Sequence, residues 1–265
     1  MQSQATTPRW SVIIPYYNEA EFIGTPLASA LAQTASLRLI LVDNRSSDGS
    51  AARARDILGA NPAIEVVYLA EDKPGQNHAL AAGFAYVAAH PTPFTAFWDA
   101  DTQYPPHYLA EAERLLARPG TVVAQGIDVY CDPDSPQGIR RRRRMVITQA
   151  ILAKQGHTGS YGQCMRTEAL ARAGGPLSPQ WPFVLYDHEL MQRLFKQGAG
   201  TGSMALWCCP SPRRSANAHV RWSLFERILY HLTPFALKDW FFYRFLAGRF
   251  TRRAMIQENL RQRDW

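Results

Sequence analysis

Residues 94–106 read FTAFWDADTQYPP, an apolar run that ends in two aspartates. The run from Phe94 to Trp98 predicts a short buried strand. Because ligands of open α/β sheets bind beyond the carboxyl ends of the strands, we expect Asp99 and Asp101 at the binding edge. Side chains two positions apart in an extended segment point the same way, so these carboxylates converge if the segment stays extended.

Short apolar runs alternate with helical patterns on both sides of this stretch, which is typical of a parallel sheet wrapped by helices. We expect strands at 10–15, 37–42, 64–69, 94–98 and 121–127, and helices from about residue 21, after residue 48, at 76–89 and from about residue 106. Polar groups follow the first two strands as well, at Pro15 to Glu19 and at Asp43 and Asn44.

The second half of the chain is less regular. We expect a helix at 138–155, an extended Gly-rich segment at 159–165, a helix at 187–196, and a helical tail from Trp222 that is both aromatic and basic. The first of these helices carries five consecutive arginines, at 140–144.

Composition limits the class of protein. The 265 residues fit one large domain, or one domain with an appendage, and 46% hydrophobic residues can fill its core. Charged residues make up 19%, too few for a disordered or coiled-coil protein. The net charge of +7 indicates anionic partners, unless it is ordinary surface charge. Acidic strand ends disfavour a nucleic-acid-binding module, which would present a basic, aromatic face.

Cysteines and hydropathy bear on the compartment. The four cysteines, at 131, 164, 208 and 209, form no C-x-x-C pair, which predicts a reduced, cytosolic chain without a zinc ribbon. Residues 1–8 lack the apolar core of a signal peptide, and no uninterrupted apolar stretch approaches the roughly 18–20 residues of a membrane span. We therefore expect a cytoplasmic protein that is not integral to a membrane.

The two aspartates predict a metal site. Carboxylates held together repel each other unless a cation lies between them. Their oxygens favour Mg²⁺ or Mn²⁺, ions that keep positions open for phosphate oxygens. Such an ion would stabilise a nucleoside diphosphate as it leaves. A D-x-D triplet also occurs as two solvated acids on an exposed turn, but this one follows an apolar strand, where unpartnered acids are costly.

Several motifs occur in order between residues 10 and 200: VIIPYYNE at 12–19, VDN at 42–44, DGS at 48–50, GQN at 75–77, DAD at 99–101, and DHEL at 187–190 followed by Arg193 and Leu194. In this set the chain resembles the inverting family 2 glycosyltransferases. The resemblance implies an α/β GT-A fold, that of nucleotide-diphospho-sugar transferases, with a mostly parallel, Rossmann-like sheet flanked by helices and a C-terminal helical tail.

The resemblance also implies a division of the chain and an activity. Residues 1–220 would form the transferase domain, with a nucleotide-binding half at about 10–127 and an acceptor half at about 128–220; residues 221–265 would form the tail. The reaction would move one sugar from a nucleotide-diphosphate donor, a UDP-sugar, to an acceptor hydroxyl. The acceptor would be a saccharide, a lipid-linked molecule or a small molecule.

Two alternatives remain open. Residues 99–106 are similar to the same stretch of polyprenyl-phosphate sugar transferases, which would make the acceptor a lipid phosphate. A sugar nucleotidyltransferase is the weaker alternative, because it would need a Gly-rich phosphate loop after the first strand, and residues 15–19 are not one.

The resemblance implies roles for individual donor-site residues. Pro15, Tyr17 and Glu19 would line the nucleotide pocket, and Asp43 would bind the base or ribose unless it is a turn residue. Lys73 would meet the diphosphate unless it is plain surface. The segment Asp99, Ala100 and Asp101 would contact the donor, its two acids would hold the metal, and Gln103 would supply a further oxygen ligand.

Asp187 lies where the family places the base that deprotonates the acceptor, and Glu189 is the backup. The family commonly has Glu-Asp there, whereas this chain has Tyr186 and Asp187. The duller alternative is an acid that complements the dipole of a helix N-terminus. If the acceptor were a phosphate, already ionised, Asp187 would matter less.

Residues 219–222 half-match the Q-x-x-R-W motif of processive members, with Ala218 in the glutamine position, which argues against processive polymerisation. Trp222 would stack on the acceptor, and His219 would complete the metal shell.

The basic run would contact phosphate or anionic lipid, with Arg140 as the acceptor contact, or form a solvated face. Aromatic and basic residues of the tail favour peripheral membrane contact through 222–250, although the same stripe would suit the protein core or a second subunit.

Overall fold

A seven-stranded sheet lies at the centre of the molecule, in the order β3-β2-β1-β4-β8-β6-β9. The structure is a computed structural model that describes residues 7–59, 64–156, 162–212 and 222–257. Its strands are β1 (Trp10–Tyr16), β2 (Leu37–Asp43), β3 (Glu65–Ala70), β4 (Phe94–Phe97), β6 (Thr121–Ala124), β8 (Gln163–Arg166) and β9 (Ala199–Thr201). The first four strands pair in parallel as predicted, whereas β8 is antiparallel to both β4 and β6.

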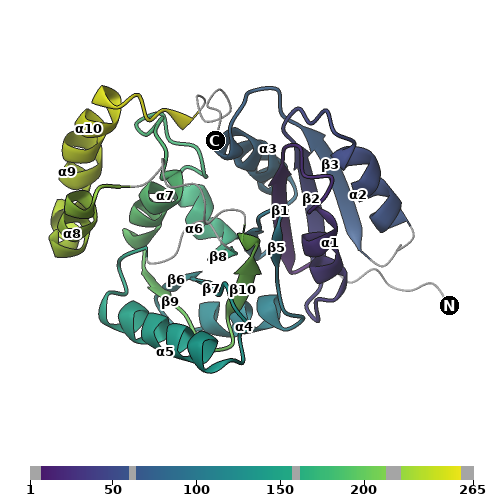
Figure 1. The fold of residues 1–265 in the computed structure, drawn as a ribbon, viewed down its shortest axis with the longest axis horizontal. Helices are drawn as coiled ribbons and strands as arrows, with labels where there is room; N and C mark the ends of the chain where they lie inside the picture. The colour runs from purple at the N-terminus through teal and green to yellow at the C-terminus, as the bar shows by residue number, and fades with distance from the viewer. Residues whose placement is uncertain (1–6, 60–63, 157–161, 213–221, 258–265) are drawn as a thin grey trace.

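Helices cover both faces of this sheet (Figure 1). Within β1, Ile13 belongs to the core shared with α3 (Gln76–Ala89) and α7 (Tyr186–Phe195). Its neighbours Val12 and Ile14 belong to the opposite core, with α1 (Gly24–Leu31), α2 (Ser50–Gly59) and α4 (Tyr108–Leu116). Burial on both faces explains why the strand is apolar at every position from 12 to 14.

The predicted strand at 121–127 is wrong as a single element. It divides into β6 and β7 (Ile127–Asp128) because the chain changes partner: the Gln125 N–H donates to Thr201, and the Ile127 N–H donates to Leu206. β7 joins β10 (Trp207–Pro210) and β5 (Thr102–Gln103) in a second, three-stranded sheet. This small sheet connects the segment after Asp101 with the start of the arginine helix.

That helix, α5 (Pro136–Ile151), differs at both ends from the prediction of 138–155. The Ser135 hydroxyl accepts a hydrogen bond from the Gly138 N–H and Pro136 occupies the first turn, so the helix begins earlier. The short helix α6 (Thr167–Arg172) was not predicted. The predicted domain boundary near residue 220 lies outside the described residues.

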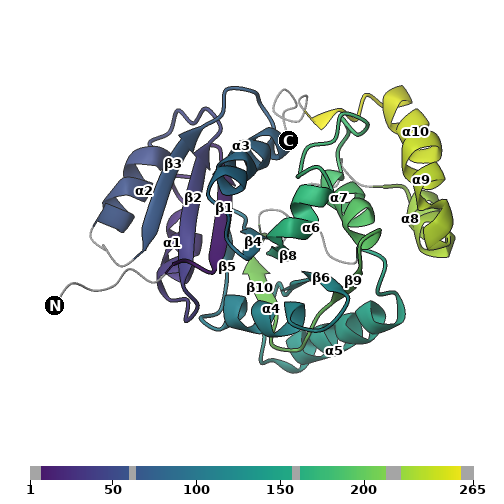
Figure 2. The same ribbon diagram turned by 180° about the vertical axis from the view of Figure 1, so that it is seen from behind.

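The C-terminal helices dock on the core. They comprise α8 (Leu224–Leu232), η3 (Phe235–Leu237), α9 (Lys238–Trp240), η4 (Phe241–Leu246) and α10 (Ala247–Arg252). The side chains of Tyr230, Phe241, Phe242 and Phe250 are buried in the cluster that contains Leu190 of α7. Figures 1 and 2 show these helices on the side of the molecule opposite α2 and β3. Within the described ranges, no helix combines the length and apolar character that a membrane crossing requires.

A buried carboxylate fixes these helices to one another. Glu226 is fully buried and pairs with Arg249 and Arg253, at 2.6 Å each. Burial by itself raises the pKa of Glu226, but the hydrogen bonds from Arg249, the Ser223 N–H and Arg253 together outweigh burial and hold that pKa below its usual value. A lowered pKa means that the ionised carboxylate stabilises the folded state.

We expect Glu226→Gln to lower the free energy of unfolding by about 2 kcal/mol, because two charge-assisted hydrogen bonds weaken. The matched control Asp239→Asn loses the exposed pair with Lys196 and alters a long hydrogen bond from Gln192, and we expect less than about 1 kcal/mol. The Glu226 contribution is present above the unfolded-state pKa and is lost as pH falls through the folded-state pKa. Urea unfolding at neutral and acidic pH measures both effects; equal losses in the two variants would contradict this role.

Candidate active site

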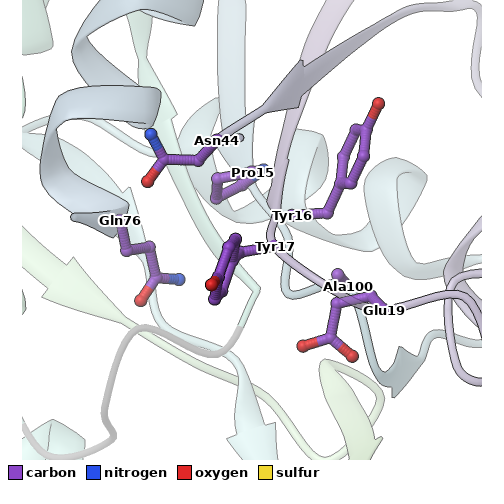
Figure 3. Close-up of a pocket in the computed structure, with 7 residues that line it drawn as sticks. All are labelled: Pro15, Tyr16, Tyr17, Glu19, Asn44, Gln76 and Ala100. Carbon is purple, nitrogen blue, oxygen red and sulfur yellow. The ribbon is translucent and has the colours of Figure 1, made fainter. Parts of the chain in front are cut away.

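A pocket of about 220 Å³ opens where β1, β2 and β4 end, and Pro15, Tyr16, Tyr17, Glu19, Asn44, Gln76 and Ala100 line it. In Figure 3 the side chains of Tyr17, Glu19 and Gln76 extend toward a shared space, whereas the ring of Tyr16 turns away from it. The structure therefore brings together four residues that the sequence assigned to the donor, Pro15, Tyr17, Glu19 and Ala100. It adds three that were not assigned: Tyr16, Asn44 and Gln76.

The loop after β1 is held against the loop after β2 by backbone N–H groups that donate to side chains. The Glu19 N–H donates to the Ser50 hydroxyl at 2.8 Å, and the Ala20 N–H donates to Asp48 at 2.9 Å. Asn18 adopts a left-handed conformation (φ 52°), and its carboxamide oxygen accepts from the Ser47 N–H. The DGS motif at 48–50 therefore positions the pocket loop and is not part of the pocket lining.

Asn44 holds the 71–75 loop in place beside the pocket. Its side-chain NH₂ donates to the Glu71 and Lys73 carbonyls, both at 2.7 Å, and its oxygen accepts from the Gly75 N–H at 3.0 Å. These bonds fix residues 71–75 immediately before α3 begins. Gly75 has a φ of 132°, a conformation that favours glycine, and lets the chain enter α3 with Gln76 at the pocket.

The two aspartates are buried, but not in the way the strand pleat predicts. β4 ends at Phe97 and residues 100–101 form a turn, so the premise of an extended 99–101 segment is wrong. Asp99 is instead held by Gln76, whose side-chain NH₂ donates to Oδ1 at 2.9 Å, and by its own N–H, which donates to the Tyr104 hydroxyl. Asp101 is fixed through its carbonyl, which accepts from the Ser211 N–H.

The carboxylate oxygens of the 99–101 turn fit a metal site in which some coordination positions remain open. In the described part of the chain, no three histidine, cysteine or acidic side chains lie close enough to hold a metal alone. A Mg²⁺-type ion is commonly held by one or two carboxylates, with phosphate oxygens and water completing its shell. Asp99 and Asp101 match that donor set. Gln103 is exposed on β5, and His219 lies outside the described residues.

Asp43 and Lys73 lie at the edge of the site. The Asp43 side chain is half-buried, and its Oδ1 accepts from the Ser46 N–H at 2.8 Å, so it makes the turn contact that was the alternative to nucleotide binding. Its Oδ2 has no hydrogen bond among the described residues. Lys73 is exposed on the 71–75 loop and is not part of the pocket lining.

Asp187 is buried in the first turn of α7, after Leu185, which adopts a left-handed conformation (φ 62°). His188 Nδ1 lies 3.2 Å from Asp187 Oδ1, and the Trp222 ring packs edge-on against the His188 ring at 5.0 Å. Burial by itself raises the pKa of Asp187, but the His188 ring and the backbone N–H groups of residues 187 and 188 outweigh burial and lower it. The Asp187 carboxylate is therefore ionised at neutral pH.

Glu189 has a different environment. Both of its oxygens accept from Arg193 Nε, at 2.9 and 3.0 Å, and Oε1 also accepts from the Tyr243 hydroxyl at 2.5 Å. A carboxylate engaged in these bonds is a poor base. The structure gives Glu189 a structural contact between α7 and the C-terminal helices, and nothing in its geometry supports the backup-base hypothesis.

A second, basic pocket of about 570 Å³ opens beside the small sheet. It is lined by Tyr130, Cys131, Gln137, Arg140, Arg141 and Arg144. Arg141 pairs with Asp128, whereas Arg140 and Arg144 have no carboxylate partner among the described residues. Arg142 is buried and donates to the Met204 and Pro133 carbonyls. Arg142 therefore has a structural role, whereas Arg140, Arg141 and Arg144 line the cavity.

Comparison with known proteins identifies related chains. An undecaprenyl-phosphate 4-deoxy-4-formamido-L-arabinose transferase of Enterobacter sp. (strain 638) is 30% identical over 168 residues, which cover 59% of this chain and 47% of that protein. An uncharacterized glycosyltransferase of Nostoc sp. is 32% identical over 48% of this chain and 41% of its own. The chain spans about half the length of the curated relatives it matches.

Solved structures share the fold. A mannosyltransferase of Pyrobaculum calidifontis, in complex with GDP-Man and Mn²⁺, aligns with a TM-score of 0.68 and 19% identity over 98% of this chain and 77% of its own. S. aureus TarS with UDP-GlcNAc aligns with a TM-score of 0.60 and 16% identity over 92% and 73%. The predicted GT-A-type α/β fold is confirmed. The model of glycosyl transferase family 2 matches residues 11–173, and the chain belongs to that family.

Proposed function

We propose that this protein transfers one sugar from a nucleoside diphosphate sugar to an acceptor, with inversion at the anomeric carbon. The observation that carries this proposal is the meeting of β1, β2 and β4 with the N-terminus of α3 at one pocket, directly beside the buried Asp99–Asp101 turn. Such a crevice beyond strand ends is where open α/β sheets bind nucleotides.

The pocket suits a nucleoside diphosphate. Tyr17 is partly exposed and offers a ring face and a hydroxyl, while Asp43 Oδ2 can accept from a ribose hydroxyl or a pyrimidine N–H. The 14-residue helix α3 begins at Gln76, so its N-terminal partial positive charge faces the pocket. Lys73, in the 71–75 loop immediately before α3, would add a positive charge that binds the diphosphate. Uridine diphosphate is our preferred nucleotide.

Asp99 and Asp101 would hold a divalent cation, Mg²⁺ or Mn²⁺. When bound, such an ion neutralises the charge that builds on a departing nucleoside diphosphate. The mannosyltransferase neighbour was crystallised with Mn²⁺, in keeping with this assignment. The chain itself holds the Asp99 carboxylate through the Gln76 side chain and the Asp99 backbone N–H through the Tyr104 hydroxyl.

Asp187 would act as the base toward an acceptor hydroxyl. The hydroxyl oxygen bonds to the anomeric carbon, the bond from that carbon to the diphosphate oxygen breaks, and the hydroxyl proton moves to the Asp187 carboxylate. The lowered pKa of Asp187 keeps this carboxylate ionised at neutral pH, which is the form that can take a proton. Trp222, packed on His188, would form one wall for the acceptor.

A lipid phosphate is the second candidate acceptor, favoured by the basic pocket at Arg140 and Arg144. Guanidinium groups without carboxylate partners suit a phosphate, and the curated relatives named above include undecaprenyl-phosphate transferases. A phosphate nucleophile needs no base, so the two candidates differ in what they require of Asp187.

For a lipid phosphate acceptor, we expect Arg140→Gln/Arg144→Gln to raise the KM for that acceptor about a hundredfold, because two charge-assisted contacts are lost. The control Arg53→Gln/Arg118→Gln removes the same charge from exposed positions elsewhere. Initial rates with a short polyprenyl phosphate and with a sugar acceptor measure the effect. An unchanged KM for the lipid phosphate would exclude this pocket as its site.

We also propose a cytoplasmic location with peripheral membrane contact. The four cysteines are free thiols, which suits a reducing compartment. The sequence assigned membrane contact to residues 222–250 as a whole, but Phe241, Phe242, Leu246 and Phe250 are buried in the core. Only the exposed residues of this segment are available to contact a membrane.

Titration calorimetry tests the donor site directly. We expect UDP to bind in the presence of Mn²⁺, more weakly without metal, and UMP to bind more weakly than UDP, because UMP lacks the second phosphate. GDP serves as the comparison nucleotide. Equal binding of UDP and UMP, with or without metal, would contradict a diphosphate site at Asp99 and Asp101.

A further inference from the structure

The α8 helix presents a coherent apolar face to solvent. Leu224, Phe225, Ile228 and Leu232 recur at the spacing of one helical face, and both Leu224 and Leu232 are 73% exposed. The opposite face of α8, with Glu226 and Tyr230, is buried in the core. The core therefore covers the inner face of α8, whereas the outer apolar face is exposed to solvent.

Aromatic side chains extend this face beyond α8. The Phe225 ring lies edge-on to the Phe245 ring, with centroids 6.2 Å apart, and the Trp240 ring stacks on Phe245, with centroids 5.8 Å apart. Trp240 is half-exposed, as is Leu237 in the preceding turn. Aromatic residues whose rings are partly apolar and partly wet are typical of a membrane interface.

The segment that follows α5 packs against the C-terminal helices. Gln155, just after α5, exchanges hydrogen bonds with His231 of α8, and Lys154 Nζ lies 4.8 Å from the Phe235 ring. In both views, α5 and α8 lie on the side of the molecule away from α2 (Figures 1 and 2). On α5, Ile147 and Ile151 are exposed, Ile151 at 74%, in line with Arg140 and Arg144 along the helix.

Among the described residues of α5 and of 224–252, the charges without an ion-pair partner are all basic. The sequence of α5 contains no acid, and the two acids of residues 224–252 are both ion-paired: Glu226 with Arg249 and Arg253, and Asp239 with Lys196. Arg143, Arg227 and Arg244 are exposed and have no carboxylate partner within the described residues. A second copy of the chain, related by a two-fold axis, would bring like charges together.

We propose that the outer faces of α5 and α8 form a docking surface for an anionic lipid membrane. Apolar side chains would enter the acyl boundary while the flanking arginines meet lipid phosphates. The same C-terminal helices hold α7, through Tyr243 on Glu189 and Asp239 on Lys196, so docking would place the Asp187 helix at a fixed distance from the bilayer. This surface rests on the peripheral membrane contact proposed above and requires no particular sugar donor.

Vesicle co-sedimentation of the full chain tests this proposal. We expect binding to phosphatidylcholine vesicles that contain phosphatidylglycerol, weakening with added salt, and little binding to phosphatidylcholine alone. Phe225→Asp/Leu232→Asp should weaken partitioning at least about tenfold. Arg143→Gln/Arg227→Gln should retain the apolar contribution but lose most of the salt dependence.

The control Ala52→Asp/Ala88→Asp adds the same charge at exposed positions of α2 and α3 and should bind as the unaltered protein does. Metal-dependent donor hydrolysis in solution should be unchanged in every one of these variants, which separates this inference from the proposed reaction. Absence of binding to anionic vesicles would overturn it. So would equal binding by Phe225→Asp/Leu232→Asp, or a fall in oligomeric state in that variant, which would assign the surface to a second copy.

Discussion

Asp187→Asn is expected to lower kcat for transfer to a hydroxyl acceptor about a thousandfold, because the amide cannot take the acceptor proton. The substitution preserves the shape of the side chain in the first turn of α7, so the packing of His188 and Trp222 should be retained. Initial rates of nucleoside diphosphate release, with and without acceptor, measure this loss.

Two comparisons make the result specific. Donor affinity by calorimetry should be unchanged in Asp187→Asn, because Asp187 does not line the donor pocket. The control Asp239→Asn removes an exposed acid on the neighbouring helix and should retain full activity. If Asp187→Asn kept most of its activity with a lipid phosphate acceptor, the phosphate alternative would be favoured and the base role would be wrong.

The pH profile of the same reaction carries a second signature of Asp187. Because its pKa is lowered, the carboxylate should remain ionised below the pH at which an ordinary aspartate protonates. For hydroxyl transfer, we therefore expect kcat/KM to decline on the acidic side only at a pH below the ordinary aspartate pKa.

Asp101→Asn is expected to lower metal-dependent turnover of the donor by at least about a hundredfold, because one of two carboxylates that would hold the cation loses its charge. The calorimetric Mn²⁺ dependence of UDP binding should weaken in parallel. Asp56→Asn, an exposed acid on α2, is the matched control. A variant that kept both its turnover and its metal dependence would show that Asp101 is not a ligand.

The parallel half of the sheet could be predicted because it depends on local patterns. β1 and β2 contain the apolar runs 12–15 and 39–42, which are buried, and polar residues follow each run. The antiparallel strand β8 and the division of 121–127 could not be predicted, because both depend on which distant strand the chain meets. Gln125 bonds to β9, and Ile127 bonds beside β10, far along the sequence.

The candidate site shows the same division. Pro15, Tyr17, Glu19 and Ala100 were assigned from motifs and lie together in the pocket. Gln76 lay inside a motif, GQN, yet its contact with Asp99 depends on where α3 begins. Asn44 follows Asp43 in another motif, but its role comes from three bonds to residues 71–75 that no spacing reveals.

The tail illustrates a limit of amphipathic patterns. From the sequence, its aromatic and basic residues favoured a membrane, although they would also have suited the core or a second subunit. In the structure, Phe241, Phe242 and Phe250 pack into the core, while Phe225 and Trp240 remain partly exposed. A helical stripe predicts burial, but the partner is decided by the tertiary structure.

The most direct test of the central claim is release of nucleoside diphosphate from a panel of UDP- and GDP-sugars, with Mn²⁺ or with a chelator, for the unaltered protein and for Asp101→Asn. We expect turnover of one donor, dependent on metal and lost in the variant. If no donor were turned over above background under any of these conditions, or if turnover persisted with the chelator and in Asp101→Asn, the proposed reaction and its site would be contradicted.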